Sequence, residues 1–409
     1  MDTTKQKTAP KSTCTFEQEI LLPWRSEEFR NNPYPWYDVL REKAPVYEDP
    51  LQENTFVISK YEDVVKFGKH PSLSMIAPKW VPESPWSMFK DSMIVANPPE
   101  HTALRRRSNK WFTPKKAIEW AEATRDAVNL ELDKLGPQGL IEGFRNLALI
   151  PAHHAMCKAM GLPTEGFDTA AAWTHDAMVA LGSQVTSEEE AKCQAAFDYL
   201  ADRTNHYLEM RRKDPVPGMV STWIDDVAKG IMTEQQLFEG VLLFWATGTP
   251  NAAYFITSGL EIFARHPEIF ETWKNEPEKR HAILNEIARL STPEISFTRF
   301  TTEPLEIRGV TIPKDKFVRF MIASANRDPE YFPEPNKVDI TRPIDSAPHL
   351  TFGIGVHSCP GMIIAQTEAR TVFDTLAERV KRIELAGDPI YNHDDRSAVY
   401  DRIPLRLVL

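Results

Sequence analysis

The stretch Phe352-Gly353-Ile354-Gly355-Val356-His357-Ser358-Cys359-Pro360-Gly361 carries a single cysteine in a glycine-rich loop. Glycine adopts positive φ at little cost, so the three glycines of this stretch allow a tight turn around the sulfur of Cys359. Such a turn directs backbone N–H groups at the sulfur and stabilises its negative charge. The apolar run at 362–365 predicts a helix whose N-terminus adds positive potential beside the sulfur. The pattern therefore predicts a thiolate held as a metal ligand.

This decapeptide closely resembles the cysteine-ligand loop of the cytochrome P-450 monooxygenases and fills every position that the family pattern fixes. The resemblance covers nearly the whole chain and implies the cytochrome P-450 fold. It also implies that Cys359 ligates the iron of haem b (iron protoporphyrin IX), as a thiolate that favours O–O cleavage. The alternative is a structural cysteine in a glycine-rich turn, and the further family motifs below weigh against it.

Composition favours one large domain. The chain has 409 residues, 42% of them hydrophobic, which is enough for a sizeable core. No internal repeat and no Gly/Ser linker divides it, and the 32 prolines are scattered. We therefore expect a flexible tail at 1–16 and a single domain over 17–409. The net charge of −10 argues against general affinity for nucleic acid.

The cysteines and the N-terminus bear on the compartment. Cys14, Cys157, Cys193 and Cys359 lie far apart and form no CxxC pair, so a zinc cluster or a disulfide framework is not expected. This usage predicts a reducing cytoplasm. Residues 1–20 are polar, and no stretch reaches the roughly 20 apolar residues of a membrane span. The interpretation is a soluble, bacterial-type member with no membrane anchor and no fused reductase.

The periodicity along the chain is mainly helical, so the predicted fold class is mainly α with small β-sheets (α+β). After a short helix at 34–40 and a hairpin at 44–59, helices are predicted over 115–135, 140–160, 165–182, 188–212, 218–228, 233–265, 268–275, 279–290 and 360–380. Short strands are predicted near 305–312, 317–321, 383–386 and 403–408.

An E-x-x-R pair on a predicted helix places Glu286 and Arg289 on one face, because residues three apart are neighbours on a helix. Such pairs are common on solvated faces. The position before the cysteine loop, and the later Asp339-Ile340-Thr341-Arg342, match the order seen in the resembled family. The resemblance implies that Glu286, Arg289 and Arg342 form a buried structural ion network.

The two propionates of a haem are anionic and are expected to bind basic side chains. His101-Thr102-Ala103-Leu104-Arg105 resembles the H-T-x-L-R of the family, and the i, i+4 spacing lets His101 and Arg105 reach one propionate. Arg299, ten residues after Arg289, and His357, two before the cysteine, match the remaining contacts. The alternative for any one of these residues is a surface side chain. Together, His101, Arg105, Arg299 and His357 are the expected cofactor-binding residues.

The long predicted helix over 233–265 departs from the family. Its usual A/G-G-x-D/E-T signature supplies an acid–alcohol pair for proton relay. Here the matching residues are Thr247-Gly248-Thr249-Pro250-Asn251, so the acid is replaced by Pro250 and the alcohol by Asn251. Pro250 cannot donate to the carbonyl of Ala246 and is expected to distort the helix. Asn251 forms hydrogen bonds but does not titrate. A relay would then use ordered water, Thr249 or the substrate.

The expected substrate pocket is largely apolar, with small hydroxyls. By resemblance, the loop at 70–96 forms its roof, with Trp80, Trp86, Met88 and Phe89 as candidate wall residues or as simple packing. The other expected lining residues are Leu243, Phe244, Thr247, Ile295, Ser296 and Phe297. Such a lining suits a small to medium apolar substrate, either terpenoid, aromatic or fatty.

The resemblance implies a monomeric monooxygenase that inserts one atom of O₂ into this substrate. Electrons would come from a ferredoxin or flavodoxin-type donor with its reductase. The basic run Arg105-Arg106-Arg107-Ser108-Asn109-Lys110, with Lys115-Lys116, is a candidate docking patch, or else a solvated face. The missing acid leaves open a haem-thiolate peroxygenase, isomerase or dehydratase, and a non-catalytic haem sensor is a further alternative.

Overall fold

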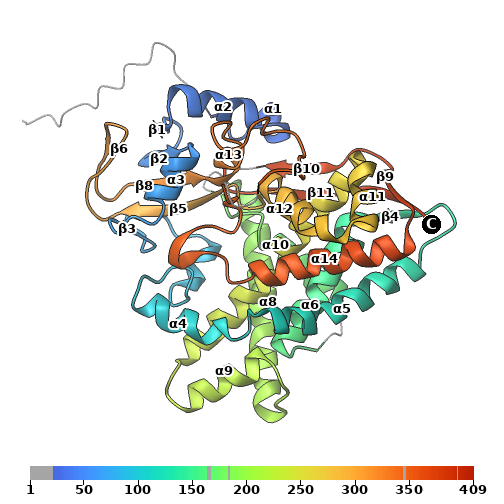
Figure 1. Cartoon of the computed structure of the whole chain (residues 1–409). Helices are drawn as coiled ribbons and strands as arrows, with labels where there is room; N and C mark the ends of the chain where they lie inside the picture. Colours follow the sequence, from blue (N-terminus) through green and yellow to red (C-terminus); the bar gives the residue numbers. More distant parts are fainter. Residues whose placement is uncertain (1–21, 164–166, 183–184, 344–346, 394) are drawn as a thin grey trace, which may run out of the picture.

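A helix of 32 residues, α10 (Glu234–Arg265), runs through the middle of the molecule in this computed structural model (Figure 1). The structure describes residues 22–163, 167–182, 185–343, 347–393 and 395–409, so the expected tail at 1–16 lies outside the described residues. Thr233 and Gln236 form a capping box at the start of α10. Most of the side chains of α10 are buried on every face, which is the pattern of a core helix.

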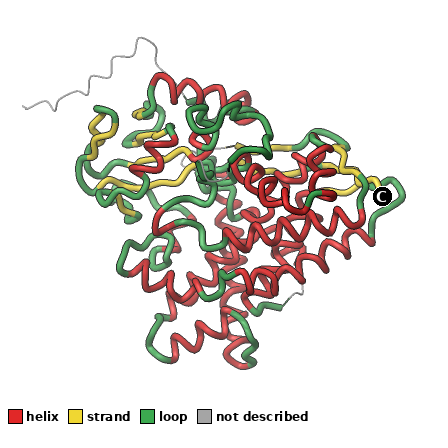
Figure 2. The backbone as a smooth tube through the Cα atoms, viewed as in Figure 1, coloured by secondary structure: helices red, strands yellow, loops and turns green. Residues whose placement is uncertain are grey.

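Thirteen further α-helices lie in the described ranges. They are α1 (Glu27–Asn31), α2 (Tyr34–Lys43), α3 (Tyr61–Phe67), α4 (Glu100–Asn109), α5 (Pro114–Asp133), α6 (Ile150–Met160), α7 (Phe167–Asp176), α8 (Ser187–Lys213), α9 (Met219–Ala228), α11 (Pro267–Asn275), α12 (Arg280–Leu290), α13 (Ile322–Ala325) and α14 (Met362–Arg379). Most of them gather around α10 in the lower and right-hand parts of Figure 2, whereas α1, α2 and α13 lie at the top and α3 beside the sheet at the left (Figure 1).

The largest sheet lies at one side of the helices (Figure 2) and has the strand order β1-β2-β8-β5-β3. Its strands are β1 (Val46–Glu48), β2 (Thr55–Ile58), β3 (Leu73–Ser74), β5 (Ser296–Thr301) and β8 (Phe317–Met321). β2 and β8 run parallel, whereas β5 is antiparallel to β8, with Ser296 opposite Met321. This sheet carries β5 to the edge of the central helices.

Three smaller sheets complete the fold. One joins β4 (Leu140–Glu142), β12 (Pro404–Val408) and β9 (Arg382–Leu385), and the other two are hairpins of β6 (Leu305–Ile307) with β7 (Val310–Ile312) and of β10 (Ile390–His393) with β11 (Ala398–Arg402). In the described ranges, no helix is both long enough and apolar enough to span a bilayer.

The predicted fold class is confirmed: helices dominate and the sheets are small. Most predicted helix ends lie within a few residues of the observed ones. The prediction over 140–160 is wrong at its start, because β4 and a π-helical turn (Gly143–Leu149) precede α6. The prediction also omitted β3, β5, β10 and β11. Pro250 lies inside α10 without ending it, so the expected distortion does not break the helix.

Candidate functional site

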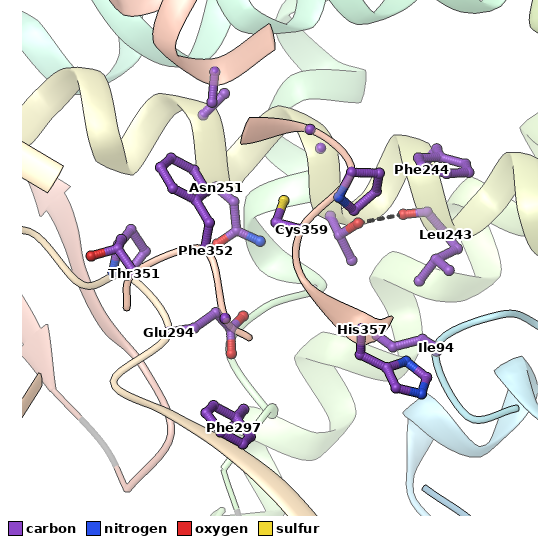
Figure 3. A pocket seen from close by; sticks show the side chains of 18 of the residues that line it. Ile94, Leu243, Phe244, Asn251, Glu294, Phe297, Thr351, Phe352, His357 and Cys359 are labelled. Atoms are coloured by element: carbon purple, nitrogen blue, oxygen red, sulfur yellow. Dashed lines mark hydrogen bonds between the residues drawn. The ribbon is translucent and has the colours of Figure 1, made fainter. Parts of the chain in front are cut away.

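A cavity between α10, α14 and β5 contains the sulfur of Cys359, and we call it the Cys359 cavity. Its walls come from α4, α6, α10, β5, the cysteine loop and the first turns of α14, with further side chains from the loop at 70–96, from the segment before β5 and, as Arg396, from the segment between β10 and β11. Figure 3 shows Cys359, Asn251, Glu294 and His357 around this space. Segments far apart in sequence thus meet at one site.

The cysteine loop has the turn that its glycines predict. Gly353 and Gly355 have φ of 69° and 72°, which are values that favour glycine. Gly361 differs from the expectation: its φ is −81°, and it serves as the N-cap residue of α14. The N–H of Cys359 donates to the carbonyl of Phe352 at 2.7 Å and holds the loop closed.

The thiol of Cys359 faces opposing influences. Enclosure by protein raises its pKa, as does the carboxylate of Glu294. Hydrogen bonds from the backbone N–H groups of Gly361 and Met362 lower it, together with the charge of Arg105. The net effect is a raised pKa, so the N–H groups of the loop and of the start of α14, with Arg105, oppose the effect of enclosure only in part.

The four cofactor-binding residues predicted from the sequence all line the Cys359 cavity. His101 on α4 and His357 in the cysteine loop lie with ring centroids 4.1 Å apart. Burial lowers the pKa of His357 to about 3, and burial with the charges of Arg105 and Arg299 lowers the pKa of His101. Burial also lowers the pKa of Arg299 to about 10. In the described residues, Nδ1 of His101 is buried without a hydrogen-bond partner.

Glu286, Arg289 and Arg342 make direct contact, as the resemblance implies. Arg289 donates to both carboxylate oxygens of Glu286, at 2.6 and 2.8 Å, and both side chains are almost fully buried. Arg342 donates from Nε to the same carboxylate at 3.2 Å. Arg289 also donates to the carbonyls of Asn326, Pro335 and Lys337, so this network ties α12 to the segment that leads to the cysteine loop.

On α10, the cavity face carries Thr247, Gly248 and Asn251, but not Thr249 or Pro250. The sequence analysis gave Thr249 as a possible relay residue, but Thr249 does not reach the cavity. Residues two apart point to opposite sides of a helix, so Thr249 is turned away from the face of Thr247 and Asn251. Thr249 is fully buried, and its hydroxyl has no partner in the described residues. The hydroxyl of Thr247 donates to the carbonyl of Leu243 at 2.7 Å, drawn as a dashed line in Figure 3.

The predicted wall residues are partly correct. Leu243, Phe244, Ser296 and Phe297 line the Cys359 cavity. Ile295, just before β5, does not: it is fully buried in the core with Tyr37 and Leu40.

The aromatic residues expected at the roof also lie elsewhere. Trp86, Met88 and Phe89 pack in the core beside α8. Trp80 donates to the carbonyl of Asp315 and is 41% exposed. Met75, Met93 and Ile94 of the same loop line the cavity instead. A loop without a periodic pattern gives no signal for which of its side chains point inward.

Three charged residues of the cavity were missed from the sequence. Glu294, Arg396 and Glu368 all line it. Burial raises the pKa of Glu368 to about 8, and burial raises that of Glu294 against the lowering effect of Arg396. Glu294 lies eight residues after Glu286, and Glu368 lies nine residues after Cys359. Their closeness to these two motifs is the signal in the sequence that could have identified them.

The family model for cytochrome P450 matches residues 177–382, half of the chain. The chain belongs to the cytochrome P450 family. It is 26% identical to a biotin biosynthesis cytochrome P450 of Bacillus subtilis (strain 168), over 88% of this chain and 92% of that protein. It is 27% identical to a vitamin D(3) 25-hydroxylase of Pseudonocardia autotrophica, over 89% of this chain and 90% of that protein.

A solved P450 structure matches the fold throughout. P450BioI, in complex with an acyl carrier protein ligated to hexadec-9Z-enoic acid, is 25% identical, with a TM-score of 0.84, over 93% of this chain and all of that one. This cytochrome P450 is thus a monooxygenase that uses haem b and O₂ and requires redox partners to act on apolar substrates.

Proposed function

We propose that Cys359 is the axial ligand of haem b in this P450, and that the Cys359 cavity holds both the haem and an apolar substrate. The observation that carries this proposal is the meeting of Cys359 with four basic side chains in one largely apolar cavity. Haem ligated by a thiolate supplies O₂ activation for insertion of one oxygen atom. The residues of this chain hold the group, exclude water and position the substrate.

The cavity fits a dianionic cofactor. Arg105 and Arg299 face it, and the pKa of each is lowered chiefly by burial. The buried guanidinium of Arg299, the partly buried one of Arg105 and the unpartnered Nδ1 of His101 offer donors to two propionates. We propose that His101, Arg105, Arg299 and His357 hold the propionates, and that Glu286, Arg289 and Arg342 form the structural network behind the haem.

The substrate proposal rests on the wall of the cavity. Leu243, Phe244, Phe297 and Met156 are apolar, and the hydroxyls of Thr247 and Ser296 are small. Relatives named for vitamin D(3) and for 6-deoxyerythronolide B support a small to medium apolar substrate, whether terpenoid, aromatic or fatty.

Asn251 is the candidate for proton delivery. It faces the cavity from α10 at the place where most relatives are expected to carry the acid–alcohol pair. Pro250 leaves the carbonyl of Ala246 without its helical donor. We propose that Asn251 and this carbonyl hold a water that delivers protons into the cavity, with Thr247 beside it.

The partner and compartment follow from the surface and the cysteines. We propose a ferredoxin or flavodoxin-type donor that docks on the basic side chains of α4 and the start of α5, where Arg106, Lys110 and Lys115 are exposed. We further propose a monomer in the cytoplasm, consistent with free thiols at Cys157, Cys193 and Cys359. The single domain over 17–409 belongs to the same proposal.

The test is the carbon monoxide complex of the reduced, haem-loaded protein. Cys359→Ser should remove the absorption band near the position typical of thiolate ligation. Cys193→Ser is the matched control, because Cys193 is buried in the core on α8 and does not line the cavity. Retention of the thiolate band in Cys359→Ser would contradict the assignment.

A haem-thiolate peroxygenase or isomerase remains the second candidate, favoured by the absence of a carboxyl group at Pro250. A peroxygenase would turn over with hydrogen peroxide as fast as with NAD(P)H and redox partners. An isomerase would turn over equally fast with no oxidant at all.

A further inference from the structure

Glu294 and Arg396 meet at the wall of the Cys359 cavity, although they are 102 residues apart in sequence. Glu294 lies between α12 and β5, and Arg396 between β10 and β11. The backbone joins the two segments directly: the N–H of Ile295 donates to the carbonyl of Arg396 at 2.9 Å, and Glu294 forms a bridge with Ser397. The fold therefore fixes both side chains before any ligand binds.

The contact between them uses one carboxylate oxygen. Nε of Arg396 donates to Oε2 of Glu294 at 3.1 Å. Oε1 has no hydrogen-bond partner among the residues that the structure describes. The side chain of Glu294 is 29% exposed and that of Arg396 is 25% exposed, and both residues line the cavity. Figure 3 shows the Glu294 carboxylate directed into the space that also holds Cys359. An acceptor oxygen is thus presented to a ligand.

The carboxylate has too little compensation for its burial. Burial raises the pKa of Glu294, and the charge and hydrogen bond of Arg396 only partly oppose this effect. A charge removed from water needs close partners for both oxygens. Besides Arg396, the wall next to Glu294 consists of apolar Pro293 and Phe297 and the hydroxyl groups of Ser296 and Thr298, with the cation of Arg299 further along β5. A cationic group of a ligand would supply the missing partner.

The sign of the ligand charge follows from the other groups that face this space. The negative charge of Glu294 reaches Cys359, where it raises the pKa of the thiol. A ligand carboxylate near Arg396 would be repelled by the carboxylate of Glu294, whereas a ligand ammonium would donate a hydrogen bond to its Oε1. The hydroxyl of Thr247 is already donated to its own helix and offers only an acceptor to the cavity. The geometry favours a donor with positive charge.

We propose that Glu294 accepts a charge-assisted hydrogen bond from a protonated amine on an otherwise apolar substrate, while Arg396 holds the carboxylate in place. This inference rests on the proposed function, because it assigns the substrate class of the same cavity. Glu294 is then a specificity-determining residue: it selects an amine-bearing molecule from other apolar molecules of equal size.

The experiment compares three probes that share a four-carbon chain and a phenyl group. N,N-dimethyl-4-phenylbutylamine carries the cation, (5-methylhexyl)benzene is its uncharged isostere, and 5-phenylpentanoate carries a carboxylate. Binding to the haem-loaded full chain at neutral pH is measured by calorimetry. The haem absorption spectrum is recorded in parallel, because a shift typical of nitrogen ligation would show that the amine binds iron rather than Glu294.

The wild type should bind the amine about tenfold more tightly than the isostere, as expected for a charge-assisted hydrogen bond. Glu294→Gln should reduce this preference to about twofold or less and leave the affinity for the isostere unchanged. Glu306→Gln, the same change at an exposed position on β6, should keep the full preference. Arg396→Gln should keep the preference for the amine over the carboxylate.

Three results would overturn the inference: equal or weaker binding of the amine, a spectrum of nitrogen ligation, or tighter binding of the carboxylate that Arg396→Gln abolishes. The last would make Arg396 an anchor for acids instead. These failures are distinct from failure of the proposed function. If the thiolate band is present and the isostere binds, the P450 assignment stands and only the amine is excluded.

Discussion

At the scale of single residues, the Cys359 cavity gathers several basic side chains, and in the described residues no ion pair joins His101, Arg105 or Arg299 to an acid. His101, Arg105 and Arg299 come from α4 and β5 and face one space. Burial lowers the pKa of all three, and the charges of Arg105 and Arg299 add to this effect at His101; an anionic cofactor would oppose both effects. Haem binding and the stability of this region should therefore be coupled.

His101→Ala, Arg105→Ala and Arg299→Ala should each speed haem loss without unfolding the protein. Each removes one charge-assisted hydrogen bond, worth about 1.5–3 kcal/mol, while the other contacts remain. The measurement is the rate of haem transfer to an excess of apomyoglobin. Rates equal to wild type in all three variants would contradict the propionate assignment.

Asn251→Ala should raise peroxide release and lower the yield of product per NAD(P)H, because the proposed water loses a hydrogen-bond partner. Thr249→Val is the control: Thr249 is buried away from the cavity, and its hydroxyl has no partner in the described residues. The substrate is first found by screening compounds for a shift of the haem absorption band on binding. Oxygen uptake, peroxide release and product formation are then measured in the same reaction. Unchanged coupling in Asn251→Ala would exclude the water relay.

At the scale of elements, the site depends on how closely α10 and α14 approach. Gly259 on α10 lies against the ring of Phe373 on α14, and a Cβ at this position would overlap that ring. Phe373 is fully buried and packs against Phe263 and Trp273, with ring centroids 4.9 and 5.4 Å away. The ring therefore has no free space into which to move.

Gly259→Ala should lower the free energy of unfolding by about 1–3 kcal/mol, the usual effect of overpacking a core. Gly136→Ala is the control, since no atom lies within 4 Å of the added Cβ. It should be neutral or stabilise by about 0.4–1 kcal/mol. Denaturant unfolding of the haem-loaded protein measures both. Adding Phe373→Leu to Gly259→Ala should restore part of the loss, and failure to do so would implicate another contact.

At the scale of the whole molecule, a chain of net charge −10 carries a basic surface on α4 and the start of α5. α4 also supplies His101 and Arg105 to the cavity, so the basic surface and the haem site share one helix. An acidic electron donor would be steered to this surface and would dock near the haem.

Reversing Arg106, Arg107 and Lys110 to glutamate should slow electron delivery at low salt and flatten its dependence on ionic strength. The expected cause is loss of steering, which salt screens over about 10 Å at 0.1 M. Stopped-flow reduction by a ferredoxin in the presence of carbon monoxide measures the rate. The rate at high salt is the internal control, because there the variant and the wild type should converge. Equal rates at low salt would show that this surface is only a solvated face.

The local sequence alone determined the features that depend on neighbouring residues. The turn at Gly353 and Gly355 requires positive φ, and glycine supplies it at little cost. Apolar periodicity located most helices, because it reflects residues within one or two turns of each other. The i, i+3 spacing placed Glu286 beside Arg289, and the structure joins them. The missing acid at Pro250 was equally visible in the sequence.

Only the tertiary structure decided which side chains share the cavity. Ile295 and Glu294 are neighbours, yet Ile295 packs in the core and Glu294 lines the cavity, because the packing of distant segments around them decides which side chain is enclosed. The partner of Glu294 is Arg396, and no local pattern joins residues that far apart. β5 pairs with β8 and with β3, which lie far from it in sequence, and such non-local pairing is not displayed by a single sequence.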